Sequence, residues 1–330
     1  MSFESLLRAA HTAARGKKKG RRVAEFMMDV EAEVIQLHRE LVSGTYRPRG
    51  YRTFGIRYPK PRTISAADFR DRVVHHALCA GLEPMFERFA IFDSYACRPN
   101  KGGLRALRRA QAFSRRFPYV LRLDVYHFFE TVDHDVLLAR LGTRVSDVRV
   151  MALLERFVRA GAPGSPAGLG LPIGNLTSQH FGFGNFLLGF IDHFIKERLR
   201  VRGYLRYLDD FVLFGDSKPA LWFARDAIGL RLEQDLKQRL RSNVTRLMPV
   251  KDGFPFLGFR IWPRVIRFDP RRLRRYRAQV RRIERAVEEG RLDESEAAVS
   301  TQGLIGWARH ADTLGMRASL MRRLEEGALR

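Results

Sequence analysis

The chain has 330 residues, 45% of them hydrophobic, so it is long enough to bury a large core and to form two or three lobes. Its 60 lysines and arginines against 36 acidic residues give a net charge of +24, which indicates a polyanionic partner, nucleic acid first. The two cysteines imply neither a disulfide framework nor a zinc site. No apolar run reaches transmembrane length and no signal-peptide pattern is present, so we expect a cytoplasmic protein without membrane contact.

The N-terminal region combines a basic run with a packing helix. The run from Arg15 to Arg22 is broken by glycines, and the alternatives are a solvated arm or an arm that contacts phosphates. Apolar residues then recur at helical spacing up to Leu41, and Gly44 ends the pattern. Residues 1–44 are therefore predicted to form a basic arm and an N-terminal helix.

Basic residues gather in the next segment. Two strands are predicted within residues 54–64, joined across prolines, with Lys60 and Arg62 at the join. These two cations would either bind a triphosphate or remain exposed loop charges. Asp68 is expected to cap a helix that runs through Leu82. This helix carries two further candidates for nucleic-acid contact, Arg70 and Arg72.

Three aspartates carry the strongest chemical signal. Asp124 lies in an apolar strand, and the pair Asp209-Asp210 lies between two apolar runs that predict a hairpin. An isolated Asp-Asp pair is usually a solvated turn. Combined with a third carboxylate, the pair can bind two Mg²⁺ ions about 4 Å apart, which would align the oxygens of an in-line phosphoryl displacement. The working hypothesis is nucleotidyl transfer.

Two segments between these aspartates bear on substrate binding. Phe129 follows Asp124 by five positions, and is either ordinary core or a ring that presses against a substrate sugar. A helix capped by Ser146 is predicted to end at Gly161. Residues 170–179 then open a long apolar helix to about residue 198, and Gly174 would allow a ligand to approach the backbone closely.

The C-terminal part is predicted to be a helix over 221–240, strands over 246–250 and 254–261, and helices from Pro263 onward. Ten arginines and two acidic residues lie between residues 264 and 285. A solvated helix would mix the two signs, so we expect a surface that faces nucleic acid. The candidates for nucleic-acid contact in this stretch are Arg271, Arg272, Arg274 and Arg275.

In this order the segments resemble the reverse transcriptase family from about Tyr51 to the C-terminus. The matching motifs are PK-x-R-x-I and DRVV within 59–74, an aspartate with an aromatic pair and H-x-x-L within 124–137, Y-x-D-D at 207–210, and F-L-G at 256–258. The resemblance implies an α+β right-hand polymerase with fingers, a palm built on an antiparallel sheet, and a helical thumb. The implied limits are fingers 45–118, palm 119–262 with a helical segment 146–161, and thumb 263–330.

The resemblance also implies roles for individual residues. Asp124, Asp209 and Asp210 would be catalytic and would bind two Mg²⁺ ions, or alternatively Mn²⁺, with Val125 as a further ligand. Neighbouring strand residues point to opposite faces, so we assign the main role within the pair to Asp209. The residues implied to bind the dNTP are Lys60, Arg62, Phe129, Ile173, Gly174 and Gln179. The residues implied to grip the primer are Phe256, Leu257 and Gly258.

The branch of the family is indicated by I-G-N-L-T-S-Q at residues 173–179, where most reverse transcriptases have Q-G. This form resembles the reverse transcriptases of diversity-generating retroelements, found in bacteria and phages. The resemblance implies a structured template RNA, cDNA synthesis with errors at template adenines, and a basic oligomeric accessory protein. Gly184 departs from the pattern, because Ala-Asn is commoner than Gly-Asn there. The alternatives are a retron, defence-associated or group II-like reverse transcriptase, or a non-catalytic RNA-binding scaffold.

Overall fold

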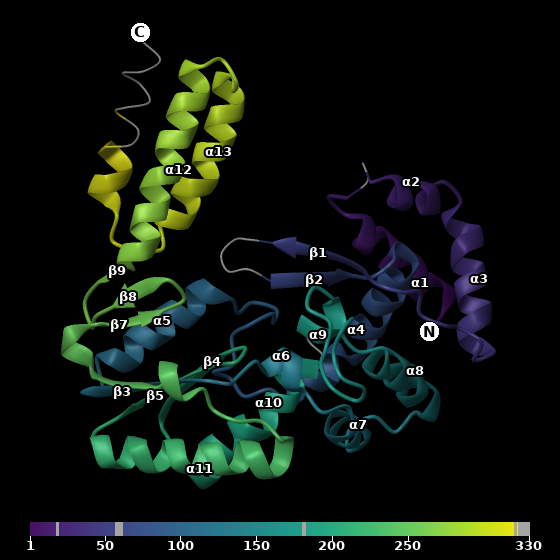
Figure 1. Ribbon diagram of the computed structural model, residues 1–330, viewed down its shortest axis with the longest axis horizontal. Coiled ribbons are helices and arrows are strands. Elements are labelled where there is room, and N and C mark those ends of the chain that lie inside the picture. Colours follow the sequence, from purple (N-terminus) through teal and green to yellow (C-terminus); the bar gives the residue numbers. More distant parts are fainter. Residues whose placement is uncertain (18–19, 57–61, 180–182, 320–321, 323–330) are drawn as a thin grey trace.

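A four-stranded antiparallel sheet carries the three aspartates and organises the rest of the chain (Figure 1). We describe residues 1–17, 20–56, 62–179, 183–319 and 322 from a computed structural model. The strands lie in the order β4-β5-β3-β6. Their bounds are β3 (Tyr119–Asp124), β4 (Gly203–Tyr207), β5 (Asp210–Gly215) and β6 (Arg246–Pro249).

Each face of this sheet belongs to a different hydrophobic cluster. Because side chains alternate along a strand, Leu121 and Leu123 point to one face while Val120 points to the other. The first face packs against α10 (Phe183–His193) and α11 (Lys218–Leu236), and α10 also contacts the N-terminal part of the chain. The second face is covered by α5 (Gly103–Ser114) and by C-terminal elements.

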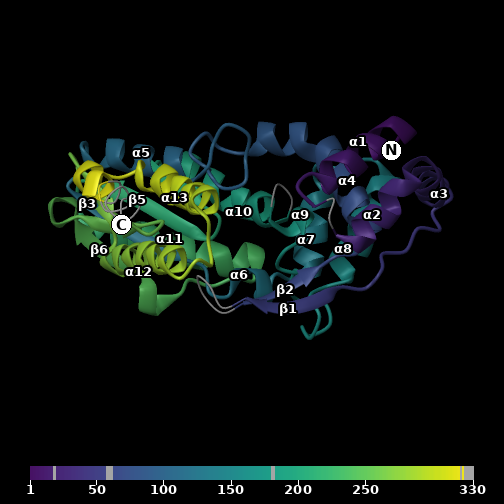
Figure 2. The same ribbon diagram turned by 90° about the horizontal axis from the view of Figure 1, so that it is seen from above.

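The N-terminal helices pack around one long helix at the opposite end of the molecule from the C-terminal helices (Figures 1 and 2). They are α1 (Phe3–Ala14), α2 (Arg21–Met28) and α3 (Val30–Val42), and the long helix is α4 (Phe69–Phe89). The single helix predicted up to Gly44 is wrong, because Asp29 leaves the helical region and separates α2 from α3. Asp68 caps α4 as predicted, and α4 continues seven residues beyond Leu82.

The two strands predicted around residues 54–64 are confirmed as the antiparallel ribbon β1 (Arg52–Ile56) and β2 (Arg62–Ala66). Lys60 lies outside the described residues.

Short helices connect β3 to β4. They are α6 (Phe128–Thr131), α7 (His134–Gly142), α8 (Val148–Arg159) and α9 (Leu176–Gln179), with a π-helical turn, Phe194–Arg198, directly after α10. The carboxylate of Asp147 accepts from the backbone amides of Arg149 and Val150, so Asp147 caps α8 rather than Ser146. Within the predicted apolar helix to residue 198, the described residues form α9, α10 and the π-helical turn, and residues 180–182 lie outside the description.

The C-terminal strands differ most from the prediction. Residues 254–261 are not one strand but a hairpin, because Leu257 and Gly258 have φ of 47° and 78° and form a two-residue turn. A third strand joins this hairpin before the helices begin. The elements are β7 (Phe254–Phe256), β8 (Phe259–Ile261), β9 (Ile266–Phe268), α12 (Pro270–Glu288) and α13 (Glu294–Ala308). No helix in the described part of the chain is long and apolar enough to cross a bilayer.

Candidate active site

The Y-x-D-D segment forms a tight hairpin between β4 and β5. Tyr207 pairs with Asp210, so Leu208 and Asp209 are the two turn residues. Leu208 has a φ of 54°, in the left-handed region where a residue with a Cβ is strained by about 1–3 kcal/mol. Strain of this kind persists only where surrounding contacts impose it, and it occurs preferentially at functional sites.

The sheet brings the three predicted aspartates together. Asp124 at the end of β3 lies directly opposite Asp210 at the start of β5. The backbone amide of Val125 donates to the carbonyl of Asp209 at 3.2 Å. Residues directly opposite in an antiparallel pair share a face of the sheet, so Asp124 and Asp210 point to the same side. All three side chains are half-buried, as expected for groups that must also reach solvent and substrate.

One partner of this site was missed by sequence reasoning. Arg122 precedes Asp124 by two positions on β3, and its Nη2 contacts Oδ2 of Asp210 at 2.7 Å. The ion pair engages Asp210 with a protein cation. The only sequence signal for it is the i, i+2 spacing to Asp124, and this becomes meaningful once the pairing of β3 with β5 is known.

The donor set suits a hard divalent cation. Mg²⁺ is usually held by one or two carboxylates together with substrate phosphates, not by a cage of protein ligands. Asp124 and Asp209 supply two such carboxylates, with the backbone of Val125 beside them. Among the described residues, no group of three or more His, Cys, Asp or Glu side chains is arranged to hold a metal by itself.

The predicted nucleotide-binding residues come from segments in direct contact. The amide of Ser65 on β2 donates to the carbonyl of Ile173 at 2.8 Å. Gly174 has a φ of 114°, and a Cβ on it would lie 2.7 Å from Cγ2 of Ile64, so only glycine fits there. Arg62 begins the same strand and is exposed. The close approach predicted at Gly174 is that of a ligand, whereas in the structure strand β2 lies against this glycine.

Phe129, in α6, is bonded through its backbone to the segment that leads to Ile173. Its carbonyl accepts from the amide of Leu171 at 2.7 Å, which ties α6 to the segment leading to Ile173. The Phe129 ring is half-buried and packs against the first hydrophobic cluster, while Phe128 is fully within it. Gln179 is the last residue of α9, and its side chain lies outside what the structure describes.

The turn at Leu257 and Gly258, named the primer-grip turn after its predicted role, lies beside the β4–β5 hairpin, named the catalytic hairpin for the same reason. A Cβ on Gly103, at the start of α5, would be 3.6 Å from Cδ1 of Leu257 and 4.0 Å from Cε2 of Tyr207. Phe256 is buried, and Gly258 closes the turn with its positive φ. Arg272 donates to the carbonyl of Leu257, and its guanidinium lies 5.2 Å from the centre of the Phe259 ring.

Several predicted nucleic-acid contacts need correction. Arg70 is buried and its Nη2 contacts Oε2 of Glu40 at 2.6 Å, so it does not face nucleic acid. Arg72 is half-buried with its guanidinium 5.1 Å from the centre of the Phe69 ring, and burial lowers its pKa. Arg272 secures the primer-grip turn, as described above. The predicted contacts that remain exposed are Arg271, Arg274 and Arg275.

Comparison with known proteins shows the family to which the chain belongs. No family model matches the chain. It is 30% identical over 274 residues to Protein YkfC of Escherichia coli K12, covering 69% of this chain and 71% of YkfC. It is 24% identical over 137 residues to the group II intron-encoded protein LtrA of Lactococcus lactis, covering 40% of this chain and 22% of LtrA. The chain belongs to the reverse transcriptase family.

The fold is that of this family's polymerases. The structure is similar to apo telomerase from Candida tropicalis truncated from its C-terminal domain, with a TM-score of 0.50 and 13% sequence identity. The similarity covers 71% of this chain and 60% of that one. In this fold, motifs that lie between residues 124 and 258 of the sequence come together at the β4–β5 hairpin.

Proposed function

We propose that the protein is an RNA-directed DNA polymerase that extends a primer by two-metal nucleotidyl transfer. The observation that carries the proposal is the β3–β5 register, which sets Asp124 opposite Asp210 and next to Asp209. Two further sets of contacts support it: β2 contacts Ile173, whose segment is bonded to Phe129 through Leu171, and the start of α5 lies against both Leu257 and Tyr207.

In this proposal each residue has a separate task. Asp124 and Asp209 hold Mg²⁺, the ion generally used by reverse transcriptases, which when bound lowers the pKa of the primer 3′-hydroxyl and neutralises the triphosphate. Arg122 keeps the Asp210 carboxylate in one orientation. Arg62 and Lys60 bind phosphates through charge-assisted hydrogen bonds. Phe129 occupies the place where a 2′-hydroxyl would be.

The same proposal includes a branch of the family. The I-G-N-L-T-S-Q sequence supports a diversity-generating retroelement enzyme, which would copy a structured template RNA with errors at adenines and act with a basic accessory protein. Ile173 gives the nucleotide apolar contact where glutamine would give a hydrogen bond, which favours misincorporation. The similarity to LtrA favours a second candidate, a group II intron-type reverse transcriptase.

Primer extension on a defined RNA with dNTPs and Mg²⁺ tests the proposal. Asp209→Asn keeps the side-chain shape and removes an anionic ligand, so extension should fall at least ~10²-fold while RNA binding persists. Asp216→Asn, an exposed position just beyond β5, is the matched control and should extend normally. Equal extension by both variants would contradict the assignment of the active site.

Sequencing the cDNA from the same reactions separates the two branches. Errors concentrated opposite template adenines support the retroelement enzyme. Accurate copying at adenines supports the group II intron-type enzyme and leaves the polymerase proposal intact.

A further inference from the structure

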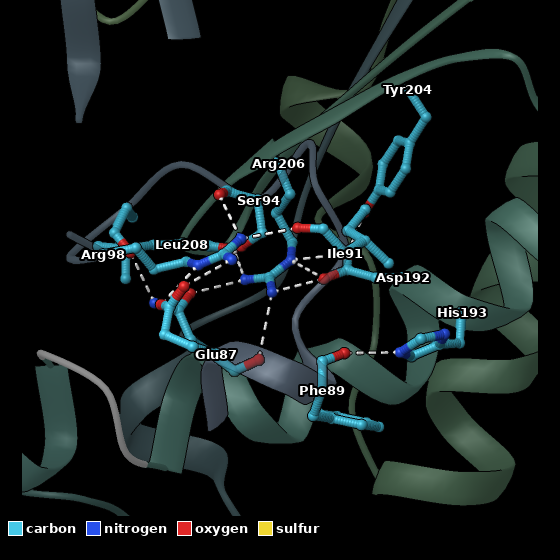
Figure 3. Close-up of polar contacts among 12 residues, drawn as sticks. Glu87, Phe89, Ile91, Ser94, Arg98, Asp192, His193, Tyr204, Arg206 and Leu208 are labelled. Atoms are coloured by element: carbon cyan, nitrogen blue, oxygen red, sulfur yellow. Dashed lines mark hydrogen bonds and ion pairs between the residues drawn. The ribbon is translucent and has the colours of Figure 1, made fainter. Parts of the chain in front are cut away.

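The catalytic hairpin contains a strained residue that requires a restraint. Leu208 has a φ of 54°, which leucine rarely adopts, and its backbone precedes Asp209 directly. The carbonyl of Leu208 accepts a hydrogen bond from Nη1 of Arg206 at 2.9 Å. Figure 3 shows the Arg206 guanidinium between the Leu208 backbone and Asp192. This bond ties the turn to the strand that leads into it.

The guanidinium of Arg206 is itself fixed from α10. Its Nε lies 2.8 Å from Oδ1 of Asp192, and its Nη2 lies 2.6 Å from Oδ2. Nη1 also donates to Oδ1 of Asn185 at 2.9 Å. The side chains of Arg206 and Asp192 are 1% and 0% exposed. Planar donors held on several sides leave the arginine essentially one position, so its bond to Leu208 has a defined geometry.

The backbone around Arg206 is anchored as well. Its amide donates to the carbonyl of Asp93 at 2.9 Å, and its carbonyl accepts from the amide of Tyr95 at 3.0 Å. Nδ2 of Asn185 donates to the carbonyl of Ala96 at 2.8 Å, so one loop is attached both to β4 and to α10. This loop pairs with the outer edge of β4 and so links the β4–β5 hairpin to α10.

Electrostatics connect Arg206 to the catalytic carboxylate. Burial opposes the charged form of Arg206, but Asp192 outweighs it and, with a contribution from Asp209, raises the pKa of the guanidinium. The side chain therefore stays cationic behind the turn. Asp192 balances its charge, and the Asp209 carboxylate interacts with the same group.

We propose that Arg206, held by Asp192 and Asn185, is a positioning residue that imposes the left-handed turn at Leu208 and thereby sets the place of the Asp209 carboxylate. Its catalytic consequence rests on the proposed polymerase function, whereas its effect on the hairpin does not. A purely structural role would stabilise the fold without any specific influence on the turn.

Arg206→Lys is the main test, because one ammonium can pair with Asp192 but cannot also reproduce the bond to Leu208. A misplaced carboxylate should lower kcat by about 10- to 100-fold. The Mg²⁺ concentration for half-maximal activity should rise several-fold, while KM for dNTP and Kd for primed RNA stay within about twofold. Glycine adopts positive φ without strain, so adding Leu208→Gly should recover part of the lost kcat.

Tyr204→Phe is the matched control. The Tyr204 hydroxyl donates to Oδ1 of Asp192 at 2.6 Å, so this variant weakens the same buried network without touching the turn. It should lower Tm but leave kcat and the Mg²⁺ response unchanged. Loss of kcat equal to that of Arg206→Lys would show that the network acts through stability alone and would overturn the proposal.

Hydrogen exchange of residues 204–214, measured by mass spectrometry without metal or substrate, gives a readout independent of activity. Arg206→Lys should speed exchange in the hairpin and Tyr204→Phe should not; equal hairpin protection in wild type and Arg206→Lys would overturn the positioning role. A wild-type protein that fails to extend primers would contradict the polymerase function and leave this exchange test valid.

If Arg206→Lys does not fold, the kcat of the single variant Leu208→Gly tests the proposal instead. Near wild-type kcat supports a backbone restraint, and a loss above about tenfold overturns it.

Discussion

Phe129 packs at the edge of the core, and its proposed second role is to select the substrate sugar. The sequence left core and sugar contact as alternatives, and the structure places the ring at the boundary, half-buried against the first cluster. A Cβ on Gly184 would lie 3.4 Å from Cε1 of Phe129 and 3.2 Å from Cε1 of Phe128. Glycine at 184, unusual for the family's pattern, therefore gives room to the aromatic pair.

Replacing Phe129 by alanine should admit a 2′-hydroxyl. We expect incorporation of rNTP relative to dNTP to rise about tenfold, which corresponds to roughly 1.4 kcal/mol of discrimination. A single-nucleotide competition assay measures the ratio. Phe128→Leu is the control, because Phe128 is buried and should affect stability but not sugar selectivity. Unchanged selectivity in Phe129→Ala would leave Phe129 as a packing residue only.

At the scale of single residues, the sequence pointed to the three aspartates but not to the two arginines near them. Asp124, Asp209 and Asp210 stand in recognisable motifs, so they were found without any structure. Arg122 and Arg206 stand in apolar strands where nothing local marks them. Their roles depend on the strand register and on α10, which are set by tertiary contacts between segments distant in the chain.

Among the elements, α9 is attached to α4 by buried polar groups. Oγ1 of Thr177 lies 3.0 Å from Nδ1 of His75, and the His75 ring lies 4.1 Å from the ring of Phe157. Asn175 and Ser178 are also buried. Thr177 thus holds α9 against α4, while the backbone of Ile173 contacts the β1–β2 ribbon at Ser65.

This attachment predicts acid sensitivity. Burial lowers the pKa of His75 to about 3, so below pH 6.5 the unfolded chain binds a proton that the folded chain rejects. The stabilisation is complete above the unfolded pKa and is lost as pH falls, by about 2 kcal/mol at pH 5. Urea unfolding at pH 7 and pH 5 measures it.

His75→Gln should reduce the pH dependence of the free energy of unfolding by that amount. His11→Gln, at an exposed position, is the control and should keep the wild-type dependence. An identical pH dependence in all three proteins would show that His75 does not titrate on unfolding in this range.

Element boundaries were predictable where capping residues mark them, as at Asp68. Boundaries were missed where only the backbone dihedral angles, and no marker residue, end the element. The turn at Leu257-Gly258 is flanked by phenylalanines and reads as one strand, and only a positive φ at both residues reveals the hairpin. The break between α2 and α3 is similarly a matter of Asp29 dihedrals, not of any change in apolar spacing.

For the whole molecule, the net charge of +24 predicts RNA binding with strong salt dependence, because each neutralised phosphate releases counterions. Arg271, Arg274 and Arg275 on α12 are exposed, and changing all three to glutamate should weaken binding. The slope of log K against log salt should flatten by about 2–3. Arg272 is kept, because its change would disturb the primer-grip turn.

Binding titrations at several salt concentrations measure the slope. The control changes Arg198, Arg200 and Arg202 to glutamate, since these exposed arginines lie at the end of β4 away from the catalytic hairpin. If both triple variants flatten the slope equally, the nucleic acid is not directed to α12 specifically.

The α+β polymerase architecture was predicted from ordered motifs, and the structural comparison confirms it. The limits proposed for fingers, palm and thumb remain a prediction. The arrangement of the hydrophobic core was not foreseeable, since α5, assigned to the fingers, buries its apolar side against the palm sheet and β7–β9. Which face of a sheet a helix covers is a long-range outcome that local spacing does not encode.

The two-sided sheet has a consequence for biosynthesis. The cluster on its first face is built almost entirely from residues that precede β6, so it can assemble while the ribosome is still translating. The second face is completed only by residues 254–308. Before these residues are translated, Val212 and Phe214 are covered only in part, by α5. A nascent or prematurely terminated chain therefore exposes an apolar face of the sheet, and residues 254–308 protect it once they fold.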